Sequence, residues 1–175
     1  MSQQSSRSFS RKLLTLFWFS MVFSVVLNTV FWFSATMFNA EWFNASFPIE
    51  VSLPLSTARS LIGYFPSMIS TMLTVALLWQ LIVLFRLYEK GIVFEFQNTV
   101  CFKKLSYLLI ATPFVELLMD ALLSFTLSYN DGSWDSSFTI DDSDITMMII
   151  GFIVRFIAVV MEKAAVLQAE SELTI

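Results

Sequence analysis

Apolar residues are concentrated in four long runs along the chain, and polar residues gather in the segments between them. The runs cover about residues 13–38, 66–88, 105–129 and 145–168. The hydrocarbon core of a bilayer is about 30 Å thick, so a helix needs roughly 20 mostly apolar residues to cross it. Each run meets this requirement. The pattern therefore predicts an all-α, polytopic membrane protein with four transmembrane helices.

These runs leave no room for a separate soluble domain. We expect a single transmembrane domain at residues 13–168, a basic leader at residues 1–12 and an acidic tail at residues 169–175. The loop before the fourth run is acidic, but its spacing matches no calcium-binding loop. It is expected to be solvated, with Asp142 or Ser143 as the N-cap of the fourth helix.

The composition of the 175-residue chain agrees with this prediction and restricts its chemistry. Hydrophobic residues make up 57% of the chain and charged residues 14%, outside the range of ordinary soluble domains. The chain has no histidine and one cysteine, which excludes histidine-based acid/base relays, histidine-ligated metals and intramolecular disulfides. The phosphate-loop, serine-hydrolase and metalloprotease motifs are also missing from the sequence. We therefore expect no enzymatic activity, no metal and no cofactor.

Basic residues are distributed unevenly around the four runs. Those near the chain ends and the middle loop are Arg7, Arg11, Lys12, Arg86, Lys90, Lys103, Lys104 and Lys163. The two remaining loops are acidic and contain Arg59 as their one basic residue. By the positive-inside rule, this distribution predicts that both termini and the middle loop lie in the cytoplasm.

Two acidic residues and one arginine interrupt the third and fourth runs. Glu116 and Asp120 are four residues apart, so they share one face of a helix. If the third span begins at Leu105, Glu116 lies about 16 Å and Asp120 about 22 Å from the cytoplasmic side. Arg155 lies about 15 Å from the opposite side, level with Glu116. Because an unpaired charge in a membrane costs roughly 2.5 to 3.5 kcal/mol, we expect Arg155 to pair with one or both acids.

The amides of Asn28 and Gln80, in the first two spans, are expected to support this intramembrane charge layer. Three interpretations of the layer remain open. It is a packing network that fixes helix register, a ligand, ion or proton site of a small transporter or sensor, or an interface with another membrane protein. The spans lack the paired glycine- and proline-broken helices of secondary transporters, which counts against transport.

Two stretches carry a resemblance to a known family. "FRLYEKGIVFEFQNTVCFKKLSYLLI" begins at Phe85, and "GFIVRFIAVVMEKAAVLQAESELTI" begins at Gly151. They resemble the small four-helix prokaryotic membrane proteins grouped as domain of unknown function 2975. This sequence departs from the family pattern at Arg155, where an apolar residue is expected. The residues that carry the resemblance are Arg86, Leu87, Gly91, Phe94, Glu162, Gln168, Glu170, Glu172, Leu173, Thr174 and Ile175.

The resemblance implies a bacterial inner-membrane location, and a small helix-turn-helix transcription regulator as a cytoplasmic partner. We predict a non-catalytic module that binds or sequesters this partner through residues 90–104 and 168–175, without contacting nucleic acid itself. An immunity-type protein that binds through its outer loops is a further alternative, and the sequence leaves the oligomeric state open. A structural role for the same surface also remains open, in which Arg86, Lys90, Lys103 and Lys104 pair with Glu162, Glu170 and Glu172.

Overall fold

The structure is a computed structural model that describes residues 3–38, 54–92, 95–128 and 141–172. These residues form four α-helices: α1 (Gln3–Met37), α2 (Thr57–Glu89), α3 (Phe96–Ser128) and α4 (Asp142–Glu172). No β-strand occurs in this part of the chain. All four helices are long and apolar enough to cross a membrane, which confirms the prediction of an all-α protein with four spans.

The helices are longer than the apolar runs predict. With 31 to 35 residues each, they are about 46 to 52 Å long, whereas the hydrocarbon core is about 30 Å thick. α2 begins nine residues before the predicted start at Pro66, because the Ser56 hydroxyl caps it by accepting a hydrogen bond from the Arg59 backbone N–H at 3.5 Å. α3 begins nine residues before Leu105, since the polar segment ahead of that residue is already helical.

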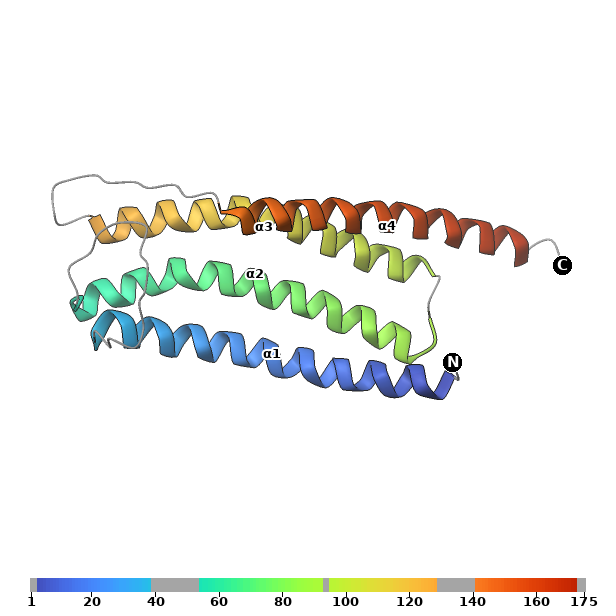
Figure 1. Cartoon of the computed structure of the whole chain (residues 1–175), viewed down its shortest axis with the longest axis horizontal. Helices are drawn as coiled ribbons and strands as arrows, with labels where there is room; N and C mark the ends of the chain where they lie inside the picture. The colour runs from blue at the N-terminus through green and yellow to red at the C-terminus, as the bar shows by residue number, and fades with distance from the viewer. Residues whose placement is uncertain (1–2, 39–53, 93–94, 129–140, 173–175) are drawn as a thin grey trace.

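The four helices pack in chain order (Figure 1). α1 packs against α2, α2 against α3, and α3 against α4, and no other two of these helices are in contact within the described segments. α1 and α4 therefore lie on the two sides of a row. The start of α1, the turn between α2 and α3, and the end of α4 lie at one end of the molecule. We call this the basic end, because Arg11, Arg86 and Lys103 lie there.

Polar contacts join α1 and α2 away from the basic end. The indole N–H of Trp32 donates to the carbonyl oxygen of Ser60 at 2.8 Å, and the hydroxyls of Thr36 and Ser60 lie 2.6 Å apart. Gly63 faces the indole ring, where a Cβ atom would lie 2.8 Å from Trp32 Cζ2. The missing side chain at position 63 thus allows α1 and α2 to approach closely enough to form these hydrogen bonds.

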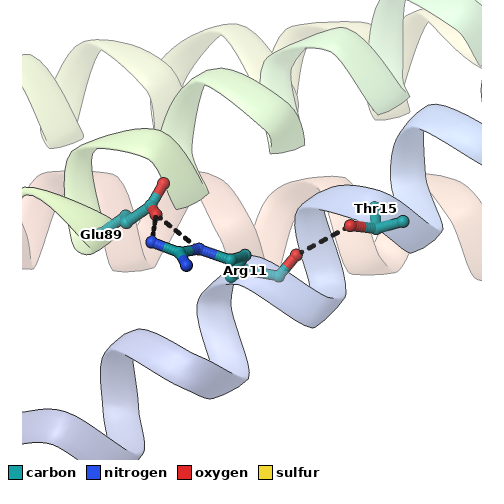
Figure 2. A network of polar contacts seen from close by, with 3 residues as sticks. All are labelled: Arg11, Thr15 and Glu89. Atoms are coloured by element: carbon teal, nitrogen blue, oxygen red, sulfur yellow. Dashed lines mark hydrogen bonds and ion pairs between the residues drawn. The ribbon is translucent and has the colours of Figure 1, made fainter.

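At the basic end, an ion pair joins α1 and α2 (Figure 2). Arg11 donates to Glu89 Oε1 from both Nε and Nη2 at 3.2 Å, and Thr15 Oγ1 donates to the Arg11 carbonyl oxygen, also at 3.2 Å. Because the Arg11 side chain is 80% exposed, this ion pair contributes little to stability. It shows which turns of the two helices lie side by side at this end.

Most large apolar side chains lie on the outside of the row, although Leu84, Cys101 and Leu105 form a buried cluster between α2 and α3. An exposed apolar surface of this extent is unfavourable in water but is covered by acyl chains in a bilayer. The chain is therefore a multi-pass membrane protein that contacts lipid. Four of the most exposed side chains are Phe65 (75%), Phe156 (69%), Phe19 (66%) and Phe114 (61%).

Candidate functional site

The contacts between α3 and α4 place most of the predicted site residues. The two helices are antiparallel, so residue numbers rise along α3 as they fall along α4. From the basic end inward, the contacting pairs are Lys103 with Glu162, Tyr107 with Arg155, Ile110 with Gly151, and Glu116 with Asp144. Each helix advances about 1.5 Å per residue, so these pairs form four successive levels along the seam between α3 and α4.

Arg155 stacks on an aromatic ring. Its guanidinium carbon lies 4.9 Å from the centroid of the Tyr107 ring, which is the geometry of a cation–π interaction. Its Nη1 atom is enclosed and has no hydrogen-bond partner within the described segments. Neither ion pair found in those segments involves Arg155. The seam thus holds a positive charge that no carboxylate of the described chain neutralises.

The prediction that Arg155 lies level with Glu116 is wrong. Arg155 contacts Tyr107, which precedes Glu116 by nine residues on α3, a separation of about 13 Å along the helix axis. The predicted depths were counted from Leu105 and Ile145 as the starts of the two spans, whereas α3 begins at Phe96 and α4 at Asp142. The actual register is set by the seam, where Gly151 contacts Ile110 and the fully buried Ala158 lies two turns further along α4. The predicted charge layer therefore divides into two separate sites.

Glu116 lies beside the first turn of α4. Its carboxyl group lies close to the carboxyl group of Asp144, which is only 6% exposed. A hydrogen bond between two carboxyl groups requires a proton on one of them. The pair brings two acidic groups of neighbouring helices together. Asp120 and Asp141 are near enough to Glu116 to repel a negative charge on it.

The start of α4 explains why Asp144 is buried. The backbone N–H of Asp141 donates to Asp144 Oδ2 at 3.0 Å, and the backbone N–H of Asp144 donates to the carbonyl oxygen of Asp141 at 3.0 Å. This arrangement resembles a capping box and places Asp141 at the N-cap, one residue before the predicted Asp142. Within the described segments, no group of three acidic or cysteine side chains is arranged to hold a metal ion.

The two amides that were expected to support the layer lie elsewhere. The side-chain N–H of Asn28 donates to the sulfur of Met68 at 3.1 Å, so this amide joins α1 to α2. Because α1 does not contact α3 or α4 within the described segments, Asn28 does not reach either charged site. Gln80 is half-buried on α2, and its support of the charged residues stays a prediction.

The predicted cytoplasmic motif ends α2. Gly91 has a φ of 82°, a backbone conformation that glycine adopts without strain. Its N–H donates to the Tyr88 carbonyl oxygen at 3.0 Å, and the N–H of Ile92 donates to the Leu87 carbonyl oxygen at 3.0 Å. These two bonds form the Schellman arrangement, in which Gly91 is the residue that follows the C-cap Lys90. Arg86 stacks over the Trp18 ring at 5.9 Å, whereas Phe94 lies outside the described residues.

The predicted ionic contact beneath the helices is present at one pair of residues. Lys103 Nζ donates to Glu162 Oε1 at 2.7 Å, which joins α3 to α4 at the basic end. The neighbouring Lys104 is exposed and forms no ion pair within the described segments. Gln168 and Glu172 belong to α4, and Glu170 is exposed there. Leu173, Thr174 and Ile175 lie outside the described residues, as do the loop residues 39–53 and 129–140 on which the immunity-type alternative depends.

The end of α4 projects from the basic end, beyond the ends of α1, α2 and α3 (Figure 1). It continues for ten residues after Glu162, about 15 Å. Val166 and Leu167 are 54% and 66% exposed on this part of the helix. They leave an apolar surface next to acidic side chains on the same helix end.

Two residues of the sites were not predicted from the sequence, Tyr107 and Asp144. An interfacial tyrosine near a basic cluster was a usable signal for the first. For Asp144, the signal was the spacing from Asp141, which matches that of a capping box.

A family model described as Protein of unknown function (DUF2975) matches residues 16–175, which is nearly the whole chain. The match confirms the resemblance and extends it to all four helices. A search of curated proteins and a search of solved structures each found no match. The chain therefore belongs to the DUF2975 family.

Proposed function

We propose that this chain is a non-catalytic protein of the bacterial inner membrane that binds a cytoplasmic partner through its basic end. Both termini then lie in the cytoplasm, as the distribution of basic residues favours. The observation that carries the proposal is the projecting end of α4, with Val166 and Leu167 more than half exposed.

Val166 and Leu167 lie at the end of the fourth span. The stretch of α4 between Asp144 and Glu162 comprises 17 residues, Arg155 among them, about 26 Å, which nearly fills the hydrocarbon core. Val166 and Leu167 follow Glu162 and Lys163 and are the last apolar residues of the candidate span, which ends at Leu167. An exposed apolar pair in that position is typical of a helix that binds another protein.

The charge next to this surface favours a basic partner. Glu170 and Glu172 follow Leu167 on α4, and the end of the chain adds no basic residue. Small DNA-binding regulators present a basic surface to the phosphate backbone. A regulator held at the end of α4 through that surface is kept away from DNA, which is a simple means of sequestration.

The family-motif residues support a role without catalysis. Gly91 ends α2, Arg86 stacks on Trp18, and Lys103 pairs with Glu162. Each of these residues has a structural explanation, and the pair of Lys103 and Glu162 joins α4 to α3 just before the projecting end of α4.

Site-specific photocrosslinking tests the proposal. A photoreactive amino acid at Leu167, in the full chain expressed in bacterial membranes, is expected to capture a small DNA-binding protein, identified by mass spectrometry. The captured regulator is then purified, and its DNA affinity is measured by fluorescence anisotropy with the membrane protein in lipid nanodiscs. We expect the nanodiscs to weaken DNA binding by the regulator.

Two variants serve as controls in the anisotropy measurement. Removal of residues 168–175 is expected to abolish the effect on DNA binding, whereas Leu61→Ser, at the opposite end of the molecule, leaves it unchanged. Leu61 is 48% exposed, so this variant also removes an exposed apolar side chain. Equal effects of the full and truncated chains on DNA binding would contradict the proposal.

One observation favours a second candidate function, a small transporter or ligand sensor. Glu116 and Asp144 bring two carboxyl groups together between α3 and α4, with Asp120 and Asp141 close by. A cation bound between these carboxyl groups changes the contact between the two helices. Protection of α3 from hydrogen exchange, measured with and without candidate cations, tests this function. If a cation changes this protection equally in the wild type and in Glu116→Gln, the function is ruled out.

A further inference from the structure

Arg155 is a charged residue inside a transmembrane helix, and the described chain supplies no carboxylate for it. Such residues are expensive to place in a membrane and almost always have a partner. Tyr107 covers one side of the guanidinium, and the enclosed Nη1 atom has no hydrogen-bond partner within the described segments. The residue as a whole is only partly buried, so a group from outside the described chain has access to the rest of the side chain.

The residues around Arg155 make this part of the seam positive. Lys103 is neutralised by Glu162, to which it donates at 2.7 Å. Lys104 lies next to Lys103 and three residues before Tyr107, so Lys104 and Tyr107 occupy one face of α3. Both side chains are exposed, Tyr107 by 59%. Arg155 stacks on Tyr107, and Lys104 lies one turn before Tyr107 on α3, so two positive charges that form no ion pair within the described segments flank an exposed phenol in the chain.

Arg155 lies within the fourth span, nearer along α4 to the ion pair of the basic end than to Asp144. Along α4, Arg155 lies seven residues before Glu162, about 10 Å inward from the ion pair at the basic end. Along α3, its partner Tyr107 lies four residues after Lys103, about 6 Å inward. A long arginine side chain in a membrane helix extends toward lipid headgroups. The phosphate of a lipid is an anion that it could reach on that side.

We propose that Arg155, Tyr107 and Lys104 form a site for the phosphate of an anionic phospholipid, in the leaflet on the side of the basic end. Arg155 binds the phosphate through its exposed guanidinium N–H groups, and Lys104 attracts the negatively charged headgroup. The Tyr107 ring fixes the guanidinium plane, and its hydroxyl donates to the lipid. Basic pockets between transmembrane helices are known binding places for anionic headgroups. The site is separate from the partner surface on Val166 and Leu167, so the two proposals fail independently.

Native mass spectrometry of the purified full-length protein in detergent tests the site. The protein is titrated with phosphatidylglycerol or with phosphatidylcholine, and the bound lipids are counted. We expect the wild type to bind phosphatidylglycerol more tightly than phosphatidylcholine. Arg155→Gln and Lys104→Gln each remove one positive charge and should lower the phosphatidylglycerol affinity by about fivefold. The affinity for phosphatidylcholine should change little.

Arg59→Gln is the matched control, since it removes one positive charge at the opposite end of α2 and should leave the lipid affinities unchanged. Gel filtration and thermal unfolding establish that each variant is folded. Lys104→Gln keeps the test decisive if Arg155→Gln does not fold, because Lys104 is exposed.

Three results would overturn the proposal. The first is equal affinity of the wild type and Lys104→Gln for phosphatidylglycerol. The second is complete displacement of phosphatidylglycerol by an equal concentration of inorganic phosphate, which would identify a site for free phosphate. The third is a lipid-independent oligomer that Arg155→Gln dissociates, which would identify the anion as a carboxylate of another protein copy.

Discussion

Gly151 of α4 lies in direct contact with Ile110 of α3. A Cβ atom at position 151 would lie 2.7 Å from Ile110 Cγ1 and 3.0 Å from the Ile110 backbone nitrogen. Because the backbone of α3 is one of these obstacles, a side-chain rotation alone does not make room. This contact sets the distance between α3 and α4 and keeps Arg155 within reach of Tyr107.

The substitution Gly151→Ala should therefore destabilise the protein. Forcing a methyl group into a closely packed contact typically costs about 1 to 3 kcal/mol. Thermal unfolding in detergent measures the effect. The matched control is Val160→Ile, which adds one methyl group to a 49% exposed side chain on the same helix. If both variants unfold at the same temperature, Gly151 does not pack closely against Ile110.

The paired carboxyl groups of Glu116 and Asp144 lead to a prediction about charge. Glu116→Gln places an amide beside Asp144, and an amide donates a hydrogen bond without needing a shared proton. We expect this variant to be at least as thermally stable as the wild type at neutral pH. Glu116→Leu has a similar size but no donor, and it should lower the unfolding temperature. The reverse order of stability would contradict the carboxyl pair.

The ion pair between Lys103 and Glu162 should have a small and salt-dependent effect. The two side chains are 28% and 39% exposed, so water and salt screen their attraction, and the coupling should be at most about 1 kcal/mol. A double-mutant cycle with Lys103→Met and Glu162→Gln measures it by thermal unfolding at low and high salt. A coupling that does not fall with salt would indicate that the pair is more deeply buried.

The positive φ at Gly91 predicts an unequal response to two substitutions. An alanine at φ 82° is strained by roughly 1 to 2 kcal/mol, whereas asparagine adopts this conformation more readily. No atom lies within 4 Å of a Cβ at this position, so the cost is conformational and not a clash. Thermal unfolding should rank the wild type above Gly91→Asn and Gly91→Asn above Gly91→Ala. Equal stability of the two variants would show that this turn is free to rearrange.

Much of the fold was predictable because it depends on local properties of the sequence. A run of about 20 apolar residues identifies a span without reference to any other segment. The end of α2 was also predictable, since Gly91 determines it through its own backbone freedom.

The relation between Arg155 and Glu116 was not predictable in this way, because it depends on how two helices slide past each other. That register is set by the small residues Gly151 and Ala158 and by the extension of α3 back to Phe96. A depth measured along each helix separately contains none of this information. The antiparallel contact of Lys103 with Glu162 was the better guide, since an ion pair at the ends of two spans fixes their relative position.

The packing of the helices in chain order has a consequence for biogenesis. Each helix packs against the helix synthesised immediately before or after it. Within the described segments, α1 makes no contact with α4, so α1 can pack before α4 has been synthesised. Contacts between segments that are near in sequence form quickly and close only short loops. The chain is thus suited to assembly one hairpin at a time, with each new helix packing on the last as it leaves the insertion machinery.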